Sequence, residues 1–184
     1  MTGRLESSEF AGISSDTGHR RPRCLSLAAA LVRFDVVICV FDTINHLMRF
    51  DLWADLFDRT HEHLVEDGLF VFDVNTIGRL QLLRRSPAQV ADVAENVMIM
   101  DVKPGADDDV SLWDLRVFEP REDGLFRLHR ERIFELGVPL ARIREALGKN
   151  FALLEEASPD EGPVTDESPR VFFACRNRLA PKML

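Results

Sequence analysis

The sequence of 184 residues predicts an α/β fold, with a parallel β-sheet at its centre and an antiparallel hairpin beside it. Two short apolar runs, residues 36–41 and 69–72, lie on either side of a segment with helical spacing. Runs that are apolar on both faces are typical of strands buried in a parallel sheet, and the segment between them is long enough for the crossover helix that such strands require. The third observation is an alternating segment, residues 112–118, which a turn joins to a second long run, residues 124–134.

The first part of the chain divides into an irregular segment and one βαβ unit. Residues 1–33 show no periodic pattern, so we expect an irregular N-terminal segment there. A strand over 34–41 and a loop follow. A helix then runs from about Asp51 to Gly68, and Gly68 is expected to have a left-handed backbone conformation that ends the helix. The second strand is expected over 69–73. The expected inner side of the helix consists of Leu52, Leu56 and His63, with Phe57 and Leu64 as further members.

The second part contains the hairpin and then returns to an α/β pattern. Residues 75–85 predict a loop and a short helix, with Thr76 as its cap. We expect the hairpin after this helix to form a lid or a side sheet over the crevice of the βαβ unit. Pro139 suits the first turn of a further helix, and two strands are expected over 151–154 and 170–176.

Composition argues against several classes of function. The formal net charge of −8 argues against nucleic acid as the main partner, because Lys and Arg carry phosphate binding. No run approaches the ~18 apolar residues that a membrane span needs. The three cysteines, Cys24, Cys39 and Cys175, show no CxxC spacing and favour a reducing cytoplasm over secretion. We therefore expect a cytoplasmic protein without a nucleic-acid or membrane partner.

Polar side chains gather where the two predicted parallel strands end. In open α/β sheets, ligands bind in the crevice beyond the carboxyl ends of the strands. His46 could contact a cofactor or help to remove a proton from an amine, or it could make only structural hydrogen bonds. Asp42 could face a substrate or only hold a local turn. The residues at these strand ends are Asp42, Asn45, His46, Asp73 and Asn75, of which the last two could equally cap the following turn.

Two charged features lie away from the strand ends. Arg130 and Arg132, on the second hairpin strand, could grip an anionic substrate, although a charged strand face is the commoner explanation. His61 and His63 do not have the HExxH spacing of a zinc site, and helical neighbours two residues apart point away from each other. We therefore expect no metal site.

From residue 34 to about 178 the chain resembles the class I S-adenosylmethionine-dependent methyltransferases. Four segments of the chain carry this resemblance. Together, in their order and spacing, they indicate the family more specifically than any one of them does alone. The loop DTINHL is similar to that of small-molecule N-methyltransferases of the glycine and sarcosine type. The matching segments are FDVVICVFDTINHL from residue 34, HLVEDGLFVFDVNT from residue 63, GKNFALLEEA from residue 148 and RVFFACR from residue 170.

The resemblance implies a partial Rossmann-like, three-layer sheet in which the last strand is antiparallel beside the second. It also implies methyl transfer from S-adenosylmethionine to a nitrogen or oxygen of a small molecule, with no need for a metal. The implied catalytic residues are His46, Asp42 and Asn45. The implied cofactor-binding residues are Val40, Phe41, Asp42 and His46. The expected substrate residues are Asn75, Arg130 and Arg132.

One departure from the family pattern limits these expectations. The family has a glycine-x-glycine turn after its first strand, where the backbone approaches the cofactor, and no such turn follows an apolar strand here. We therefore expect a domain whose start is truncated or atypical and whose isolated chain binds S-adenosylmethionine weakly or not at all. The alternative is a non-catalytic remnant that acts as an interaction module, for example as a homodimer through an exposed sheet edge. A nicotinamide oxidoreductase is disfavoured because the sequence has no GxGxxG motif.

Overall fold

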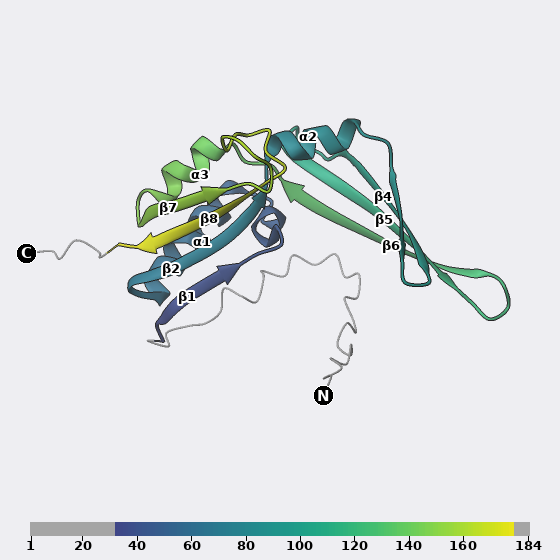
Figure 1. Ribbon diagram of the computed structural model, residues 1–184, viewed down its shortest axis with the longest axis horizontal. Helices are drawn as coiled ribbons and strands as arrows, with labels where there is room; N and C mark the ends of the chain where they lie inside the picture. The colour runs from purple at the N-terminus through teal and green to yellow at the C-terminus, as the bar shows by residue number, and fades with distance from the viewer. Residues whose placement is uncertain (1–31, 179–184) are drawn as a thin grey trace, which may run out of the picture. The chain divides into compact units, whose positions relative to one another are not determined.

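The computed structural model describes residues 32–178, so the expected irregular segment lies almost wholly outside the described residues (Figure 1). The first sheet has the order β1-β2-β8-β7, and its strands are β1 (Phe34–Cys39), β2 (Leu64–Asn75), β8 (Arg170–Asn177) and β7 (Phe151–Ala157). β1 is parallel to β2, and β8 is antiparallel to both β2 and β7. The predicted parallel pair and the predicted antiparallel strand beside it are therefore confirmed.

The hydrophobic core lies on one face of the first sheet, where helices α1 (Phe50–His63) and α3 (Leu140–Leu147) both contribute to it. Alternate residues of the strands supply the sheet side of this core, as the pleat requires. The rings of Phe72 and Phe173 stack with their centroids 4.7 Å apart, and Phe57 of α1 packs against Phe72. Aromatic pairs of this kind add to the free energy gained by burial.

The opposite face of the first sheet is apolar but exposed. Val36 and Ile38 of β1 alternate with Val37 and Cys39, which pack against the core. The exposed apolar residues of this face are Val36, Ile38, Leu69 and Phe172, with exposed fractions from 36% for Leu69 to 64% for Ile38. Residues 32–178 thus contain two of the three layers that we expected, namely the sheet and the helices on one of its faces.

The predicted inner side of α1 is right at Phe57 and Leu64, which are buried, but its phase is shifted because Trp53 and not Leu52 is buried. The buried residues of α1 are Trp53, Phe57 and Thr60, whereas Leu52 and Leu56 are only partly buried. Trp53 is fully buried, and its indole Nε1 donates to the Leu47 carbonyl oxygen at 2.8 Å. The phase differs because the large Trp53 ring is buried while its polar Nε1 atom keeps a hydrogen-bond partner. The spacing of apolar residues alone does not reveal such a partner.

The boundaries of α1 also differ from the prediction. The helix begins at Phe50, with Arg49 rather than Asp51 at its N-cap position, and it ends at His63. β2 begins at once with Leu64, so the segment predicted to end the helix is already extended. Asp67, and not Gly68, has the positive φ of 59°. Aspartate tolerates this conformation because its short side chain can bond locally.

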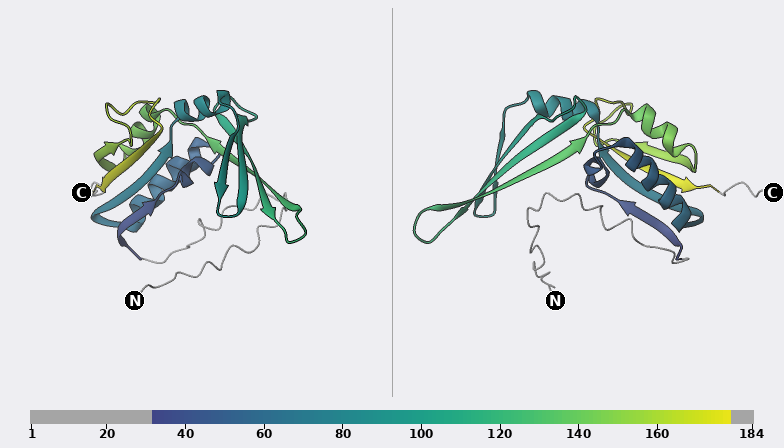
Figure 2. Two further views of the ribbon diagram at one scale, coloured as in Figure 1. Left: turned by 45° about the vertical axis from the view of Figure 1, so that its right-hand side comes forward. Right: turned by 180° about the vertical axis from the view of Figure 1, so that it is seen from behind.

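The predicted hairpin is part of a larger second sheet (Figure 2). β5 (Val110–Pro120) and β6 (Phe126–Leu136) form the hairpin, and β4 (Asn96–Pro104) and β3 (Gln89–Val93) extend it in the order β3-β4-β5-β6. All residues of β3 are exposed, so this strand has no alternation that could have predicted it. The short helix α2 (Ile77–Arg85) joins β2 to this sheet.

The predicted cap of α2 is confirmed. The Thr76 hydroxyl accepts a hydrogen bond from the Arg79 amide at 3.0 Å and donates to the Ser168 carbonyl oxygen at 2.5 Å. Gly78, two residues after Thr76, donates a hydrogen bond from its amide to the Asp166 carbonyl oxygen at 2.9 Å. The start of α2 is thereby fixed to the loop that precedes β8.

Candidate functional site

The candidate site begins where β1 turns into the short helix η2 (Thr43–His46). Phe41 and Asp42 both have left-handed backbone conformations, with φ of 61° and 50°. This conformation is uncommon for a residue such as Phe41, and strained backbone of this kind clusters at functional sites. The Phe41 side chain is 80% exposed, so the turn presents an aromatic ring at the surface beside Asp42.

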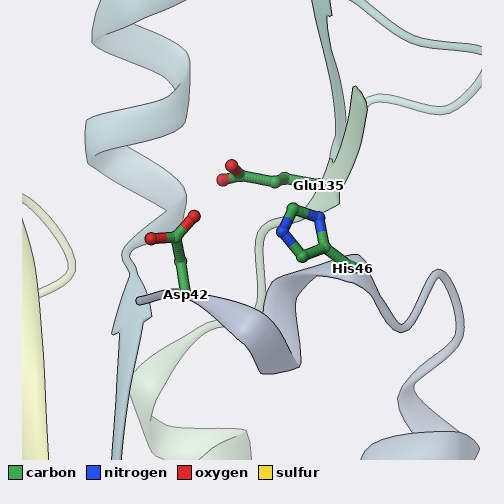
Figure 3. A group of neighbouring side chains, drawn as sticks. All are labelled: Asp42, His46 and Glu135. Carbon is green, nitrogen blue, oxygen red and sulfur yellow. The ribbon is translucent and has the colours of Figure 1, made fainter. Parts of the chain in front are cut away.

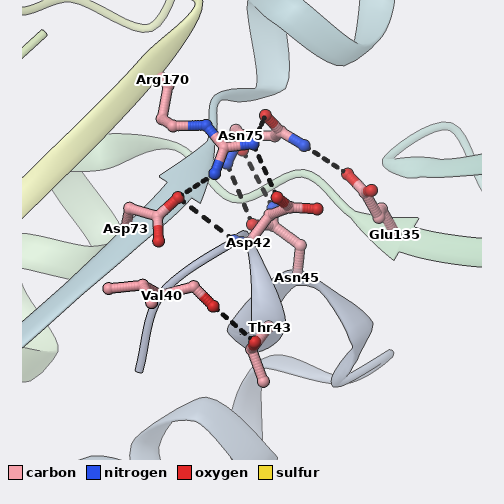
Figure 4. Close-up of polar contacts among 8 residues, drawn as sticks. All are labelled: Val40, Asp42, Thr43, Asn45, Asp73, Asn75, Glu135 and Arg170. Carbon is pink, nitrogen blue, oxygen red and sulfur yellow. Dashed lines mark hydrogen bonds and ion pairs between the residues drawn. The ribbon is translucent and has the colours of Figure 1, made fainter. Parts of the chain in front are cut away.

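Arg170 connects the ends of β1 and β2 (Figure 4). Its guanidinium donates to Asp42 Oδ1 at 2.6 Å and also contacts Asp73 Oδ2. The Asp42 amide donates to Asp73 Oδ2 as well, at 3.2 Å. Asp73 is fully buried, and its Oδ1 has no hydrogen-bond partner. The single Arg170 guanidinium thus binds two carboxylates, and it fixes the position of the Asp42 side chain. Because two negative charges face one positive charge, the site keeps an excess of negative charge.

Asn45 and Asn75 form a reciprocal pair that fixes η2 on β2. The Asn75 amide donates to Asn45 Oδ1 at 3.0 Å, and Asn45 Nδ2 donates to the Asn75 carbonyl oxygen at 2.9 Å. Asn45 Nδ2 also donates to the Leu136 carbonyl oxygen at 3.0 Å. Asn45 is fully buried, so all of these bonds are made away from water. Through these hydrogen bonds, Asn45 fixes the position of the loop that contains η2.

Glu135, near the end of β6, brings a third carboxylate to the site. It is 3% exposed, and its Oε2 accepts a hydrogen bond from Asn75 Nδ2 at 2.9 Å. Burial raises the pKa of the Glu135 carboxyl to about 7. The nearby Asp42 carboxylate also raises this pKa, whereas the Asn75 hydrogen bond and the Arg170 charge lower it. The side chain therefore changes its charge near neutral pH.

His46 lies at the end of η2 and is held by the strand that carries Glu135. Its Nδ1 is 3.1 Å from the Phe134 carbonyl oxygen. A carbonyl oxygen can only accept, so Nδ1 carries the proton and Nε2 of the neutral ring is an acceptor. Figure 3 shows the imidazole with its other nitrogen turned toward the side chains of Asp42 and Glu135.

Asp42, His46 and Glu135 form a group that we call the acceptor trio. One ligand atom from each of the three side chains lies within 4.8 Å of the others. Such a set could hold a cation, and the donor types would suit a transition metal. However, the Arg170 guanidinium is already bonded to Asp42, so a divalent ion would be held next to a fixed positive charge.

The structure thus brings together most of the predicted site residues but not all of them. Hydrogen bonds join Asn45 to Asp42 and to Asn75, and one ligand atom of His46 lies within 4.8 Å of one of Asp42. The Val40 carbonyl oxygen accepts a hydrogen bond from the Thr43 hydroxyl at 2.6 Å. Arg130 and Arg132 are exposed on β6, five and three residues before Glu135. An odd spacing along a strand puts these arginines on the face opposite to Glu135.

Sequence reasoning missed Glu135 and Arg170. Both reach the site from positions 60 or more residues away from the strand ends that they contact. A signal for Glu135 was present, since it interrupts the apolar residues Ile133, Phe134 and Leu136. A charged residue in such a run needs a partner if it is buried.

The arrangement suits the sulfonium end of S-adenosylmethionine. A positively charged sulfur is complemented by the carboxylates at the strand ends, and the exposed Phe41 ring offers an apolar contact beside them. The residues that the resemblance implies as cofactor-binding, Val40, Phe41, Asp42 and His46, all lie in the turn after β1 and in η2. In the described part of the chain, no glycine-x-glycine turn follows a strand to receive the rest of the cofactor.

Comparison with known proteins supports the class of fold. No protein-family model matches the chain. A protein of Geobacillus sp. (strain WCH70) named "Putative methyltransferase" is 28% identical over 149 residues, which cover 78% of this chain and 59% of that protein. A crystal structure of a S-adenosylmethionine-dependent methyltransferase from Clostridium acetobutylicum has a TM-score of 0.70 at 20% identity, covering 82% of this chain and 61% of that one.

A third relative has its cofactor bound. The structure of S-adenosylmethionine-bound CalS10, an amino pentose methyltransferase from Micromonospora echinaspora, has a TM-score of 0.61 at 12% identity and covers 81% of this chain. The chain spans 59% to 61% of the length of these three relatives. The strand order, the antiparallel β8 and these similarities together confirm the resemblance: residues 32–178 have the fold of class I S-adenosylmethionine-dependent methyltransferases.

Proposed function

We propose that the site formed by η2, β2 and β6 serves methyl transfer from S-adenosylmethionine to a nitrogen or oxygen of a small molecule. The observation that carries the proposal is the convergence of Asp42, His46 and Glu135 beyond the carboxyl ends of two parallel strands, in a fold shared with proteins named as S-adenosylmethionine-dependent methyltransferases. When bound, S-adenosylmethionine supplies an electrophilic methyl group, whose bond to sulfur breaks as the lone pair of the acceptor forms the new bond.

The residues of this chain would align the acceptor and receive its proton. Asn45 and Asn75 hold η2 against β2, so the side chains that leave η2 have fixed positions. His46 Nε2 and the Asp42 and Glu135 carboxylates are acceptors, and each of them could take up or hold a proton. The methyl group of the cofactor is already activated. The protein therefore has only to align the acceptor with it and to hold a proton acceptor near the acceptor atom.

The test is an NMR titration of the full chain with S-adenosylhomocysteine, the demethylated form of the cofactor. We expect weak binding that shifts the backbone amides of Val40, Phe41 and Asp42, with NAD as a control ligand that leaves them unchanged. If S-adenosylhomocysteine shifts none of these amides even at millimolar concentration, the methyltransferase proposal fails and the non-catalytic alternative replaces it.

We also propose a small-molecule substrate and a cytoplasmic location. The substrate class is supported by the similarity to structures of proteins named as small-molecule methyltransferases, among them the amino pentose methyltransferase CalS10. In the part of the chain that the structure describes, no helix has the length and apolar character of a membrane span. Fractionation of the native host, followed by immunodetection of the chain, tests the location.

A further inference from the structure

The second sheet ends in the edge strand β6, and two contacts show which of its backbone groups point outward, away from β5. His46 Nδ1 lies 3.1 Å from the Phe134 carbonyl oxygen. Asn45 Nδ2 donates to the Leu136 carbonyl oxygen at 3.0 Å. In an antiparallel pair, the N–H and C=O of one residue point to the same side, and successive residues alternate. The backbone groups of the even-numbered residues of β6 therefore point away from β5.

The residues that flank β6 agree with this alternation. The Gly137 amide donates to the Asp109 carbonyl oxygen at 2.8 Å, and the Leu125 carbonyl oxygen accepts from the Arg121 amide at 2.9 Å, so these odd-numbered residues face the hairpin partner. η2 covers the outer side of β6 only near its end. We call residues 126–132 the open edge, because in the described part of the chain no strand pairs with the outer backbone groups of Leu128, Arg130 and Arg132.

The side chains at the open edge are basic on one face. Arg130 and Arg132 lie on the same face of β6 and are exposed, and neither side chain forms an ion pair or hydrogen bond within residues 32–178. Asp114, opposite Arg132 in the ladder, bonds instead to Lys103 and Arg116, at 3.0 and 3.1 Å. This face therefore offers two positive charges without a partner, although the net charge of the chain is −8.

Exposed apolar side chains flank these two arginines. Phe126, Leu128 and Phe134 lie on the same face of β6 and are 42% to 57% exposed. Charges on an edge strand often serve only to discourage pairing, but that role does not account for three large apolar side chains left in water beside them. A face that is apolar at both ends and basic in the middle is complementary to an extended segment that is apolar at its ends and acidic in its middle.

We propose that the open edge of β6 binds an extended acidic segment of another protein, which adds a fifth strand to the second sheet. The outer N–H and C=O groups of Leu128, Arg130 and Arg132 form the new ladder. Carboxylates two residues apart in the segment share one face and meet the two guanidinium groups. This inference goes beyond the proposed methyl transfer and does not depend on it.

Other occupants of the open edge fit less well. A second copy of β6, paired about Arg130, would place arginine opposite arginine, and like charges in that position destabilise a strand pair. The parts of this chain outside the described residues carry five Lys or Arg against three acidic residues, so they are not acidic. An anionic membrane would meet the whole protein with its net charge of −8, whereas a short segment is influenced mainly by charges within a Debye length of about 8 Å.

The test is binding of three synthetic peptides to the full chain, measured by amide hydrogen exchange. Acetyl-LTETETL-amide presents two glutamates between two leucines on one face, in either strand direction. Acetyl-LTKTKTL-amide reverses the charge, and the glutamate peptide with all internal amides N-methylated keeps the charge but cannot form a ladder. We expect only the first peptide to slow exchange at the outward amides of Leu128, Arg130 and Arg132. The amides that point toward β5 should stay unchanged, namely those of Arg127, His129 and Glu131.

Substitutions on the two faces of β6 test the charge contacts. A variant with both Arg130→Gln and Arg132→Gln should bind acetyl-LTETETL-amide about three- to tenfold more weakly, because two cross-strand charge pairs are lost. Arg127→Gln is the matched control, since Arg127 is exposed on the opposite face, 3.8 Å from the Glu119 carboxylate. It should bind the peptide as the wild type does.

Several outcomes would overturn the proposal. Equal binding of the glutamate and lysine peptides would remove the role of the arginines, and equal binding of the N-methylated peptide would remove that of the ladder. Slower exchange that does not follow the alternation of β6, or no binding at all, would refute the added strand. Binding to phosphatidylserine vesicles but not to acetyl-LTETETL-amide would assign the edge to a membrane instead. If the double variant does not fold, as judged by its circular dichroism spectrum, the comparison of the peptides on the wild type decides.

Discussion

At the scale of single residues, Glu135 should make the stability of the protein depend on pH. Its folded pKa of about 7 lies above the ordinary value of 4.5, so the folded state binds more protons than the unfolded state between these values. The free energy of unfolding therefore falls as the pH rises through this window, by up to roughly 3 kcal/mol. Glu135→Gln should lack this decrease, and urea unfolding of both proteins between about pH 4.5 and 8.5 measures it. Parallel pH profiles of the two proteins would contradict the expectation.

Glu135 could not be predicted as a site residue from the sequence, whereas the residues at the strand ends could. Asp42, Asn45 and His46 follow β1 closely and Asn75 ends β2, so their position in the sequence already placed them at the strand ends. Which residue of a long hairpin strand reaches back to the first sheet depends on the twist and docking of the second sheet, and neither is encoded in local spacing.

Phe41 is a second residue whose backbone predicts a measurable effect. With φ of 61° and an exposed side chain, it has the strain of the left-handed conformation without compensation from burial. Glycine avoids this strain and alanine does not, so Phe41→Gly should be more stable than Phe41→Ala by roughly 1 kcal/mol. Urea unfolding of the two variants provides the comparison. Greater stability of the alanine variant would show that the turn relaxes when the ring is removed.

At the scale of elements, the type of each strand and helix was easier to predict than its phase. The sequence placed the helix between the two parallel strands, because its length and spacing allow little else. The buried side of that helix was assigned to Leu52, Leu56 and His63, with Phe57 and Leu64 as further members. The structure buries Phe57 and Leu64 as expected, but it also buries Trp53 and leaves Leu52 only partly buried. Two neighbouring apolar faces compete in this helix, and the larger aromatic side chains gain more from burial.

Substitutions in α1 test the corrected phase. Trp53→Ala should destabilise the fold by about 3–5 kcal/mol, because it removes a fully buried side chain and the hydrogen bond to the Leu47 carbonyl oxygen. Leu52→Ala, at the neighbouring position that is only partly buried, should cost well under half as much. Thermal unfolding of both variants checks the order. A larger loss for Leu52→Ala would restore the phase expected from spacing.

Gly78 tests the attachment of α2 to the loop before β8. A Cβ atom at this position would lie 2.4 Å from the Asp166 carbonyl oxygen and 2.9 Å from the Glu167 Cα atom, which are backbone atoms that cannot move aside alone. Gly78→Ala should therefore cost about 1–3 kcal/mol, as overpacking does. Gly148→Ala is the control, because Gly148 has an ordinary φ of −58° and an added Cβ would come no closer than 3.3 Å to another atom. Equal losses for the two variants would show that α2 is not held at Gly78.

At the scale of the whole described chain, sequence predicted the βαβ unit, the antiparallel last strand and the hairpin. It did not predict that β3 and β4 enlarge the hairpin into a four-stranded sheet, because all residues of β3 are exposed and the half-buried residues of β4 do not alternate with exposed ones. The sequence also did not reveal that only one face of the first sheet packs against the core. Both faces of β1 are apolar in sequence, but only Val37 and Cys39 pack against the core.

This asymmetry gives β1 two properties that favour association. Among residues 32–178, β1 pairs only with β2, so its other edge offers unpaired backbone groups. Its open face is apolar at Val36 and Ile38, which have exposed fractions of 47% and 64%, and no charged side chain of β1 between them opposes pairing. An edge of this kind is a template for another strand. We predict that residues 24–32, of which 24–31 lie outside the described residues, cover this edge, or that the chain forms dimers or larger species through it.

Lysine substitutions on the two faces of β1 separate folding from association. Val37→Lys places a charge toward the core and should destabilise the fold by several kcal/mol. Ile38→Lys points into the open face, so it should leave the unfolding free energy within about 0.5 kcal/mol while reducing self-association, because a charge at a sheet edge discourages pairing. Light scattering measures the association, and hydrogen exchange over residues 24–41 reports coverage of the edge. A wild-type monomer in which residues 24–32 exchange freely would refute both ways of covering β1.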